Sequence, residues 1–240
     1  ALAGEVDGTR SALGLALHSV RAVPRAWMGP LAEGARARGL PVHGHVSEQP
    51  GEVTQCRAAT GLSPVGLLAD EGVLDPRFTA VHATWLDDDD LALLASSGAT
   101  VCLCPTTEGD LGDGVPRTEE LLARGVPLCV GSDSHAVIDP FAELRMLEYQ
   151  ARAATGRRCV VTDPDGQVGP ALWRIGAEQG YRALGLDPAG DHIVLDAQAR
   201  VFDGGAGSLA TAVTAGHPGL VREVVVAGDT VVVDGRWAGR

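Results

Sequence analysis

The chain has 240 residues, 45% of them hydrophobic, which is enough apolar material for one globular domain with a small appendage and excludes a disordered chain. Its formal net charge of −12 argues against a basic surface for nucleic acid or anionic lipid, so we expect no partner of either kind. No apolar run approaches the roughly 18 residues that a membrane-spanning helix needs.

Short apolar runs typical of buried strands alternate with helical patterns from Leu13 to Gly131. In the fourth helix Asp87 is the predicted N-cap and Gly98 the stop, and we interpret the acidic run from Asp87 to Asp90 as a solvated helix start. Strands are predicted at 13–18, 40–46, 78–83, 99–105 and 126–131, and helices at 27–39, 49–60, 65–72, 88–97 and 118–124.

This alternation with short connections predicts an α/β fold with parallel strands, and the regular spacing favours a TIM-type (β/α) barrel over a doubly wound sheet. A closed barrel has eight strands, so about five units form only a partial barrel from which roughly three strands are missing. Because an open five-stranded section would leave bare sheet edges and an uncovered barrel interior, we expect the chain to be an amino-terminally incomplete copy of a longer protein.

The remainder of the chain has a different pattern. Helices are predicted at 140–154 and 168–184, followed by the strand-like runs HIVLD and EVVVAGDTVVVDGRW, the second with a Gly-Asp turn. We therefore expect a barrel section with its following helices over 1–185 and a small β appendage over 186–240.

The cysteines are predicted to be reduced thiols, because their number is odd, none has CxxC spacing and most lie in strand-like runs. No secretory signal is recognisable, and together these features predict a cytoplasmic location. The cysteines are Cys56, Cys102, Cys104, Cys129 and Cys159.

Several predicted strands end in a polar side chain just before a loop. His45 closes one strand with Glu48 three residues after it, His82 follows a later strand, and Asp133 follows the last of the five. Enzymes on a β/α barrel take catalytic groups from the carboxyl ends of several strands, so we expect these four residues to converge on one site. An imidazole there can hold a metal ion, and a nearby carboxylate can carry protons.

Neighbouring residues leave some alternatives open. His43 lies two residues before His45 and so on the same strand face, which allows a metal-binding HxH pair, although a hydrogen-bonded core histidine is the favoured reading. His18 and Arg21 flank the end of the first strand, and an arginine fork there suits a carboxylate. The segment TTEGDLGDG at 106–114 is acidic and lacks the lysine of a phosphate loop, so we expect a rim loop with Glu108 facing the site.

At these residues the chain resembles the amidohydrolase superfamily and, within it, the bacterial formimidoylglutamate deiminases. The segments LALHSVRAV, HGHVSEQPGEV, VHATWLD, CPTTEGDLGDG and GSDSHAVIDPFAELRMLEYQ carry the likeness, which extends over nearly the whole chain, and the ending AGDTVVVDGRW is similar to the returning β-sandwich of the superfamily.

The resemblance implies a function and a set of roles. N-formimino-L-glutamate would be hydrolysed to N-formyl-L-glutamate and ammonia in a step of histidine degradation, with one zinc ion (or another divalent metal) held by His45 and Asp133. Asp133 would also act as base, Glu48 would move protons and His82 would stabilise developing charge. His18, Arg21 and Glu108 would contact a small substrate with carboxylates, and the complete enzyme would be a homodimer.

The HxH metal pair that this family carries on its first barrel strand has no counterpart here, so we expect weak zinc binding and little turnover from these 240 residues alone. Two alternatives to the deiminase hypothesis remain. In the first, the chain is part of another deaminase, such as a guanine deaminase, and in the second it is a noncatalytic fragment. The low aromatic content of 4% disfavours a nucleobase substrate.

Overall fold

The computed structural model describes residues 11–134, 137–203 and 208–239. Its larger sheet has five parallel strands in sequence order, and all five correspond to predicted strands. Each strand pairs with the next along the chain, as a succession of βα units with right-handed crossovers requires. The strands are β1 (Leu15–Ser19), β2 (Val42–Val46), β3 (Phe78–His82), β4 (Thr100–Leu103) and β5 (Leu128–Val130).

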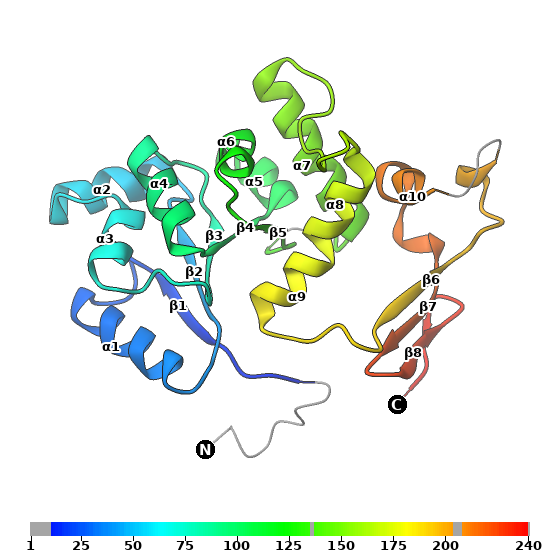
Figure 1. Cartoon of the computed structure of the whole chain (residues 1–240), viewed down its shortest axis with the longest axis horizontal. Coiled ribbons are helices and arrows are strands. Elements are labelled where there is room, and N and C mark those ends of the chain that lie inside the picture. Colours follow the sequence, from blue (N-terminus) through cyan, green and yellow to red (C-terminus); the bar gives the residue numbers. More distant parts are fainter. Residues whose placement is uncertain (1–10, 135–136, 204–207, 240) are drawn as a thin grey trace.

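Helices connect these strands and pack outside the curved sheet, with α1 to α4 forming the group at one end of the molecule in Figure 1. The prediction for the acidic helix start is confirmed, since Asp87 and Asp90 form a reciprocal capping box at the start of α4 and Gly98 ends that helix. These helices are α1 (Arg25–Arg36), α2 (Pro50–Thr60), α3 (Pro64–Asp70), α4 (Asp88–Ser97), α5 (Pro105–Leu111) and α6 (Thr118–Ala123).

The two faces of the large sheet differ in chemistry. On β2, Val42 and Val46 are buried in the core with residues of the surrounding helices, whereas His43 and His45 are half-buried on the opposite, concave face. The strand period of two produces this division. The concave face is therefore where polar side chains collect.

Two predicted segments are wrong in detail. Residues 106–111, predicted as part of the rim loop 106–114, belong to the short helix α5, because Pro105 suits its first position and the Glu108 carboxylate accepts the backbone N–H of Cys104. The predicted helix at 168–184 is divided at Ala177 into α8 (Val168–Gly176) and α9 (Glu178–Leu184), where Ala177 has a φ of −92° and a ψ of −74°. α7 (Pro140–Thr155) matches its prediction closely.

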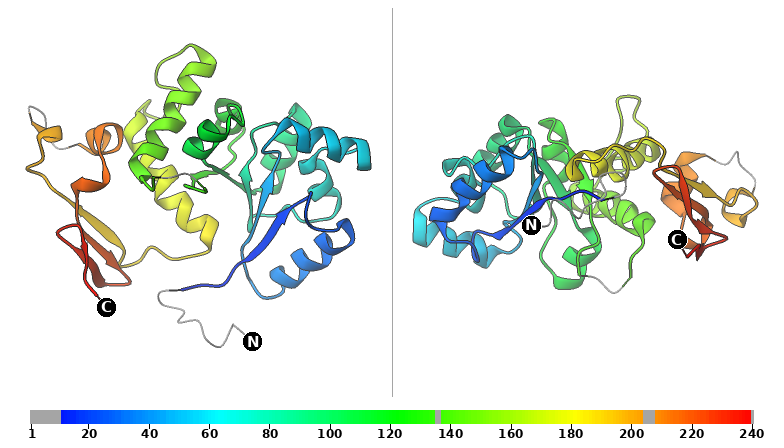
Figure 2. Two further views of the ribbon diagram at one scale, coloured as in Figure 1. Left: turned by 180° about the vertical axis from the view of Figure 1, so that it is seen from behind. Right: turned by 90° about the horizontal axis from the view of Figure 1, so that it is seen from below.

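The carboxyl-terminal strands form a separate antiparallel sheet, with α7 to α9 between it and the large sheet (Figure 2). A short helix, α10 (Leu209–Ala215), returns from this region and packs against α7 and α8. The four strands are β6 (His192–Leu195), β7 (Val221–Val226), β8 (Asp229–Val233) and β9 (Arg236–Trp237). A five-stranded parallel α/β fold is thus established, while the partial barrel, the sandwich remnant and the division at residue 186 stay predictions.

Gly44 sets the close approach of β1 to β2. A Cβ placed on it would lie 2.5 Å from the carbonyl oxygen of Leu17, which is backbone and cannot give way cheaply. We therefore expect Gly44→Ala to destabilise the chain by about 1–3 kcal/mol in urea unfolding. Gly51→Ala is the matched control, since nothing lies within 4 Å of its Cβ position, and it should leave the midpoint unchanged or raise it slightly. An equal loss in both variants would contradict this account.

Candidate active site

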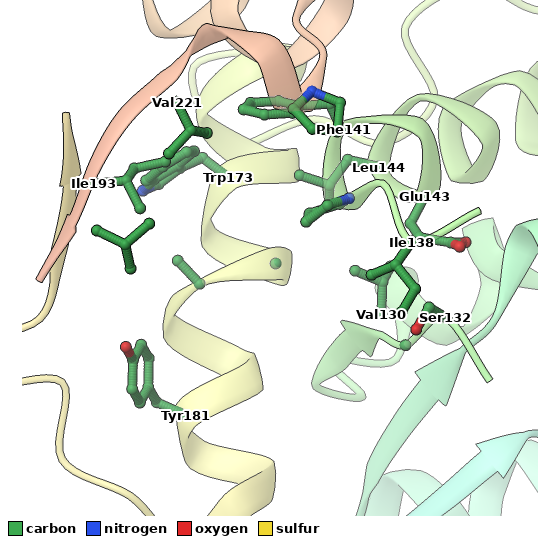
Figure 3. A pocket seen from close by; sticks show the side chains of 16 residues that line it. Val130, Ser132, Ile138, Phe141, Glu143, Leu144, Trp173, Tyr181, Ile193 and Val221 are labelled. Atoms are coloured by element: carbon green, nitrogen blue, oxygen red, sulfur yellow. The ribbon is translucent and has the colours of Figure 1, made fainter. Parts of the chain in front are cut away.

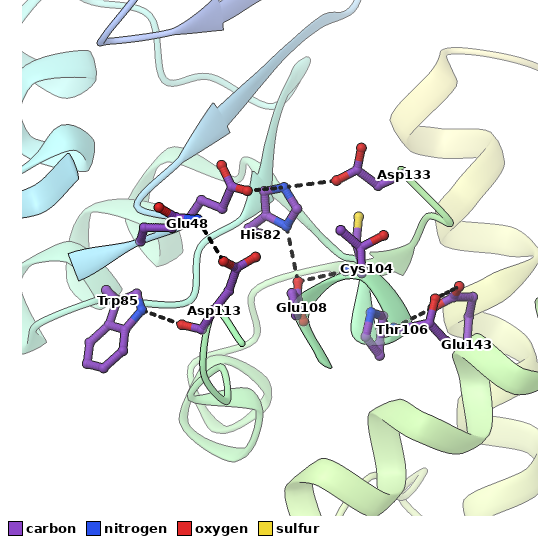
Figure 4. Close-up of polar contacts among 12 residues, drawn as sticks. Glu48, His82, Trp85, Cys104, Thr106, Glu108, Asp113, Asp133 and Glu143 are labelled. Atoms are coloured by element: carbon purple, nitrogen blue, oxygen red, sulfur yellow. Dashed lines mark hydrogen bonds and ion pairs between the residues drawn. The ribbon is translucent and has the colours of Figure 1, made fainter. Parts of the chain in front are cut away.

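The carboxyl ends of β1, β2 and β3 place three histidines side by side. The ring centroids of His18 and His45 are 5.1 Å apart, and those of His45 and His82 are 5.6 Å apart and nearly parallel. Asp133, beyond β5, approaches His82 from the other side, with its Oδ2 atom 3.3 Å from Nε2 of His82. Figure 4 shows Glu48 and Asp133 on either side of the His82 ring. The residues named from strand ends therefore meet at one edge of the sheet.

The backbone of His82 is unusual and is what turns its side chain toward this site. Val46 and His82 are register partners, so strict alternation would send the His82 side chain to the helix-covered face with Val46. Instead His82 has a φ of 71° and Ala83 a φ of 52°. Left-handed backbone at residues other than glycine costs about 1–3 kcal/mol and clusters at functional sites. Asp133, with a φ of 49°, shares this feature.

His82 is fully buried among carboxylates. Its Nδ1 atom lies 3.3 Å from Oε1 of Glu108, and its Nε2 atom lies 3.9 Å from Oε1 of Glu48. Burial alone would lower the pKa of His82, but the hydrogen bond and charge of Glu108, together with the charges of Glu48 and Asp133, outweigh it and raise the pKa above its ordinary value. The imidazole is therefore set up to carry a proton.

Glu108 is also completely buried, and it contacts His82 and the backbone N–H of Cys104 rather than open space. This geometry suits a residue that orients His82. The prediction that Glu108 contacts substrate is untested.

His45 is held in one tautomer by its neighbour. Its Nδ1 atom lies 2.8 Å from the carbonyl oxygen of His18, and because a carbonyl can only accept, Nδ1 carries the hydrogen. The Nε2 lone pair is then free for a metal, the arrangement usual for metal-binding histidines. In contrast, His43 donates through Nε2 to the carbonyl oxygen of Ala183 in α9, at 2.8 Å, which supports the core role over an HxH pair.

The residues expected to meet the substrate lie at the outer side of this cluster. Arg21 donates from Nη2 to Oε2 of Glu48 at 3.0 Å, and the Arg21 side chain is 39% exposed. The Nδ1 atom of His18 is 3.1 Å from the hydroxyl of Ser19. Arg21 is therefore a half-solvated cation directly beside the carboxylate expected to move protons.

Several supporting residues escaped the sequence reasoning. Buried Glu52 accepts the backbone N–H of Glu48, and burial raises the pKa of Glu52. Gln49 donates to the side chain of Asp113 at 3.0 Å, while Trp85 donates to the Asp113 carbonyl. Glu52 is four residues after Glu48 at the start of α2, a spacing that could have indicated it.

Contacts across the chain also fix the rim beyond β4. The side chain and backbone N–H of Thr106 donate to Glu143 of α7, and the Thr107 hydroxyl donates to the carbonyl of Ser132. Because Thr106 and Glu143 are 37 residues apart, no local sequence pattern predicts this contact.

A groove lies beside this cluster, and the histidines of the cluster do not line it. This groove of about 630 Å³ opens between β5, α7, α8 and the small sheet, and its walls are mainly apolar (Figure 3). Ser132 and Glu143 lie at its end near Asp133, whereas His45, Glu48 and His82 do not line it. The chemistry therefore belongs to the histidine and carboxylate cluster at the strand ends.

The donor types of this cluster are ones that a divalent metal ion accepts. His45 offers a free Nε2, and Asp133 offers a carboxylate. Nitrogen and carboxylate oxygen are ligands that zinc accepts in catalytic sites. The two residues belong to the carboxyl ends of different strands, His45 to β2 and Asp133 to the segment after β5.

Parallel strands with histidines and carboxylates at their carboxyl edge are an arrangement that hydrolases of α/β folds use. Residues 5–231 match the amidohydrolase family model, and the chain belongs to that family. It is 38% identical to the formimidoylglutamate deiminase of Pseudomonas aeruginosa over 99% of this chain and 54% of that enzyme. It is 32% identical to a 5-methylthioadenosine/S-adenosylhomocysteine deaminase of Moorella thermoacetica over 71% of this chain and 39% of that one.

Solved structures agree on the fold. An amidohydrolase from Brucella melitensis superposes with a TM-score of 0.85 at 33% identity, covering 95% of this chain and 52% of that one. A Xanthomonas campestris adenosine deaminase with bound zinc gives a TM-score of 0.87 at 24% identity, covering 95% and 53%. The chain thus spans about half the length of the deiminase relative and of these structures. No helix within the described residues is long and apolar enough to cross a membrane.

Glu108→Gln should lower the pKa of His82, because it removes the carboxylate whose hydrogen bond and charge favour the imidazolium form. The titration is followed by NMR of the His82 ring in the metal-free chain. Glu119→Gln, which alters an exposed carboxylate paired with Arg157, is the control and should leave His82 unchanged. An unchanged His82 pKa in Glu108→Gln would contradict the conclusion that Glu108 raises it.

His45→Ala should weaken zinc binding by about tenfold or more, because it removes a ligand with a preset lone pair. Competition with a chromogenic chelator measures the affinity. His43→Gln keeps a donor for the Ala183 carbonyl and should bind zinc as the parent chain does. A larger loss of zinc affinity in the His43 variant than in the His45 variant would instead support an HxH metal pair.

Proposed function

We propose that this chain provides the catalytic carboxyl-terminal half of an enzyme that hydrolyses N-formimino-L-glutamate to N-formyl-L-glutamate and ammonia. The observation that carries the proposal is the 38% identity to a formimidoylglutamate deiminase over 99% of the chain. The placement of Arg21 beside the carboxylate cluster supports it, because the substrate brings two carboxylates of its own.

The proposed roles follow from the geometry of the cluster. Asp133 and Glu48 lie on either side of His82, so one carboxylate can accept the proton of the attacking water and the other can deliver a proton to the departing nitrogen. His82, with its raised pKa, can donate a hydrogen bond to the oxygen of the tetrahedral adduct, where negative charge develops. Glu108 keeps the His82 ring in place through Nδ1.

A divalent cation, with zinc as the expected ion, would be held by His45 and Asp133 and would supply Lewis-acid activation of water at neutral pH. The remaining steps use the chain's own groups. Burial of His82 and of Glu108 excludes water from the far side of the ring, which strengthens their mutual hydrogen bond.

Arg21 is the proposed anchor for a substrate carboxylate. In the structure its guanidinium is paired with Glu48, and a substrate carboxylate can take over that pairing and release Glu48 for proton transfer. Binding and activation would then be coupled through one arginine.

The second candidate is a deaminase of adenosine-type substrates, favoured by the relatives that act as 5-methylthioadenosine/S-adenosylhomocysteine or 5'-deoxyadenosine deaminases, at 28–34% identity. Trp85, 44% exposed and just beyond His82, is the side chain on which a nucleobase could stack. A noncatalytic fragment is the third possibility.

The substrate is tested by joining these 240 residues to the amino-terminal part of the P. aeruginosa deiminase and measuring ammonia release. We expect turnover of N-formimino-L-glutamate and none of guanine, 5'-deoxyadenosine or S-adenosylhomocysteine. The same protein with His82→Asn is the control and should lose activity. Release from a nucleoside alone would replace the proposal with the second candidate, and no release from any substrate would support the fragment.

Arg21→Ala in that protein should lower kcat/KM for N-formimino-L-glutamate by roughly 10- to 150-fold, the equivalent of a charge-assisted hydrogen bond of about 1.5–3 kcal/mol. If Arg21 holds one substrate carboxylate, Arg21→Ala should lower kcat/KM less for an analogue that lacks this carboxylate than for N-formimino-L-glutamate itself. Arg57→Ala, which alters an arginine paired with Asp87 at the surface, should leave the kinetics unchanged. Equal losses for both substrates would mean that Arg21 acts only through Glu48.

A further inference from the structure

Three of the five thiols gather on the concave face of the large sheet. Cys102 and Cys104 lie two residues apart, so they project from the same side of the chain at the end of β4. Cys129 of β5 is the register partner of Cys102. The Cys102 thiol is hydrogen-bonded to both Cys104 and Cys129, which makes it the middle member of the group.

This thiol group lies directly against the buried part of the site. Ligand atoms of His82, Cys104 and Glu108 all lie within 4.8 Å of one another, and all three residues are buried. Figure 4 shows Cys104 beside Glu108 and to one side of the His82 ring. The Nε2 atom of His82 and the Oε2 atom of Glu108 are buried without a hydrogen-bond partner among the described residues. His82 and Glu108 therefore place ligand atoms beside the Cys104 thiol, which in turn neighbours Cys102.

The backbone makes room for the two sulfur atoms. A Cβ on Gly131 would lie 3.2 Å from Sγ of Cys102 and 3.4 Å from Sγ of Cys104, so both sulfurs rest against the one residue of this segment without a side chain. Cys102 is half-buried, which leaves an approach from the concave face, whereas Cys104 is 1% exposed. The two sulfurs thus share one small space with an entrance.

The thiols are neutral when no cation is bound. The hydrogen bond with Cys104 lowers the pKa of Cys102, but its hydrogen bond with Cys129 and its burial raise that pKa further, well above the ordinary value. The hydrogen bond with Cys102, together with burial, raises the pKa of Cys104 as well. Neutral buried thiols are poor nucleophiles, so covalent catalysis is an unsuitable use for them.

We propose that Cys102, Cys104 and His82, with the Glu108 carboxylate as fourth ligand, form a site for a thiophilic d¹⁰ cation such as Cd²⁺ or Cu⁺. Two sulfurs, one imidazole nitrogen and one oxygen are a donor set that soft cations prefer over Mg²⁺ or Ca²⁺. The site is distinct from the His45 and Asp133 pair, which has no sulfur. Because it takes His82, a cation bound there inhibits any reaction that uses this histidine, whatever the substrate.

The test uses the reduced, metal-free 240-residue chain, titrated with Cd²⁺ while the ultraviolet thiolate-to-cadmium charge-transfer band is recorded. We expect the band to saturate at one equivalent. Cys102→Ala and Cys104→Ala should each weaken Cd²⁺ binding by about tenfold or more and remove much of the band. Cys104→Ser, which keeps the size of the side chain, serves as a second variant if the alanine variant fails to fold by circular dichroism.

Three controls separate this site from others. Cys129→Ala and Cys56→Ala should retain the band, because neither thiol belongs to the proposed ligand set. His45→Ala should also retain it, since the expected catalytic metal site contains no thiolate. His82→Asn should weaken the binding. No band in the parent chain, a band that survives the loss of Cys102 and Cys104, or one that disappears with His45 would overturn the proposal.

Discussion

The left-handed backbone at His82 is the constraint on which the site depends. A regular strand would have sent this side chain into the helix-covered core with its register partner Val46. The positive φ of His82 instead brings the imidazole to the concave edge, where it meets Glu48, Glu108 and Asp133. The cost of that backbone, about 1–3 kcal/mol, is offset by the surrounding packing and hydrogen bonds.

Charge explains why the site suits a cation. Three carboxylates face one buried imidazole, and only that of Glu108 is fully buried, so a positive group among them offsets their mutual repulsion and the burial of Glu108. A protonated His82 and the Arg21 guanidinium supply part of that charge, and a metal ion would supply the rest. The family to which the chain belongs is consistent with this arrangement, and the length of the deiminase relative indicates that about half of its chain has no counterpart here.

Much of the fold was accessible from local patterns. The five strands, their order and the start and end of α4 follow from apolar runs, a capping aspartate and a terminating glycine, all of which act over a few residues. The two wrong segments have weaker signals in the sequence. In α5 the Glu108 carboxylate accepts the Cys104 N–H, a contact over four residues, and also contacts distant His82, whereas the helix predicted at 168–184 is divided at Ala177.

The sequence by itself determined the parallel strand order and which polar residues stand at strand ends, because alternation and spacing are properties of neighbouring residues. Only the tertiary structure decided what each of them faces. In the folded chain His43 bonds the carbonyl of Ala183, 140 residues away, and Glu108 contacts His82. Cys102 lies beside Cys104 and Cys129. These contacts depend on how the strands pair and on one reversed backbone torsion, which no local pattern records.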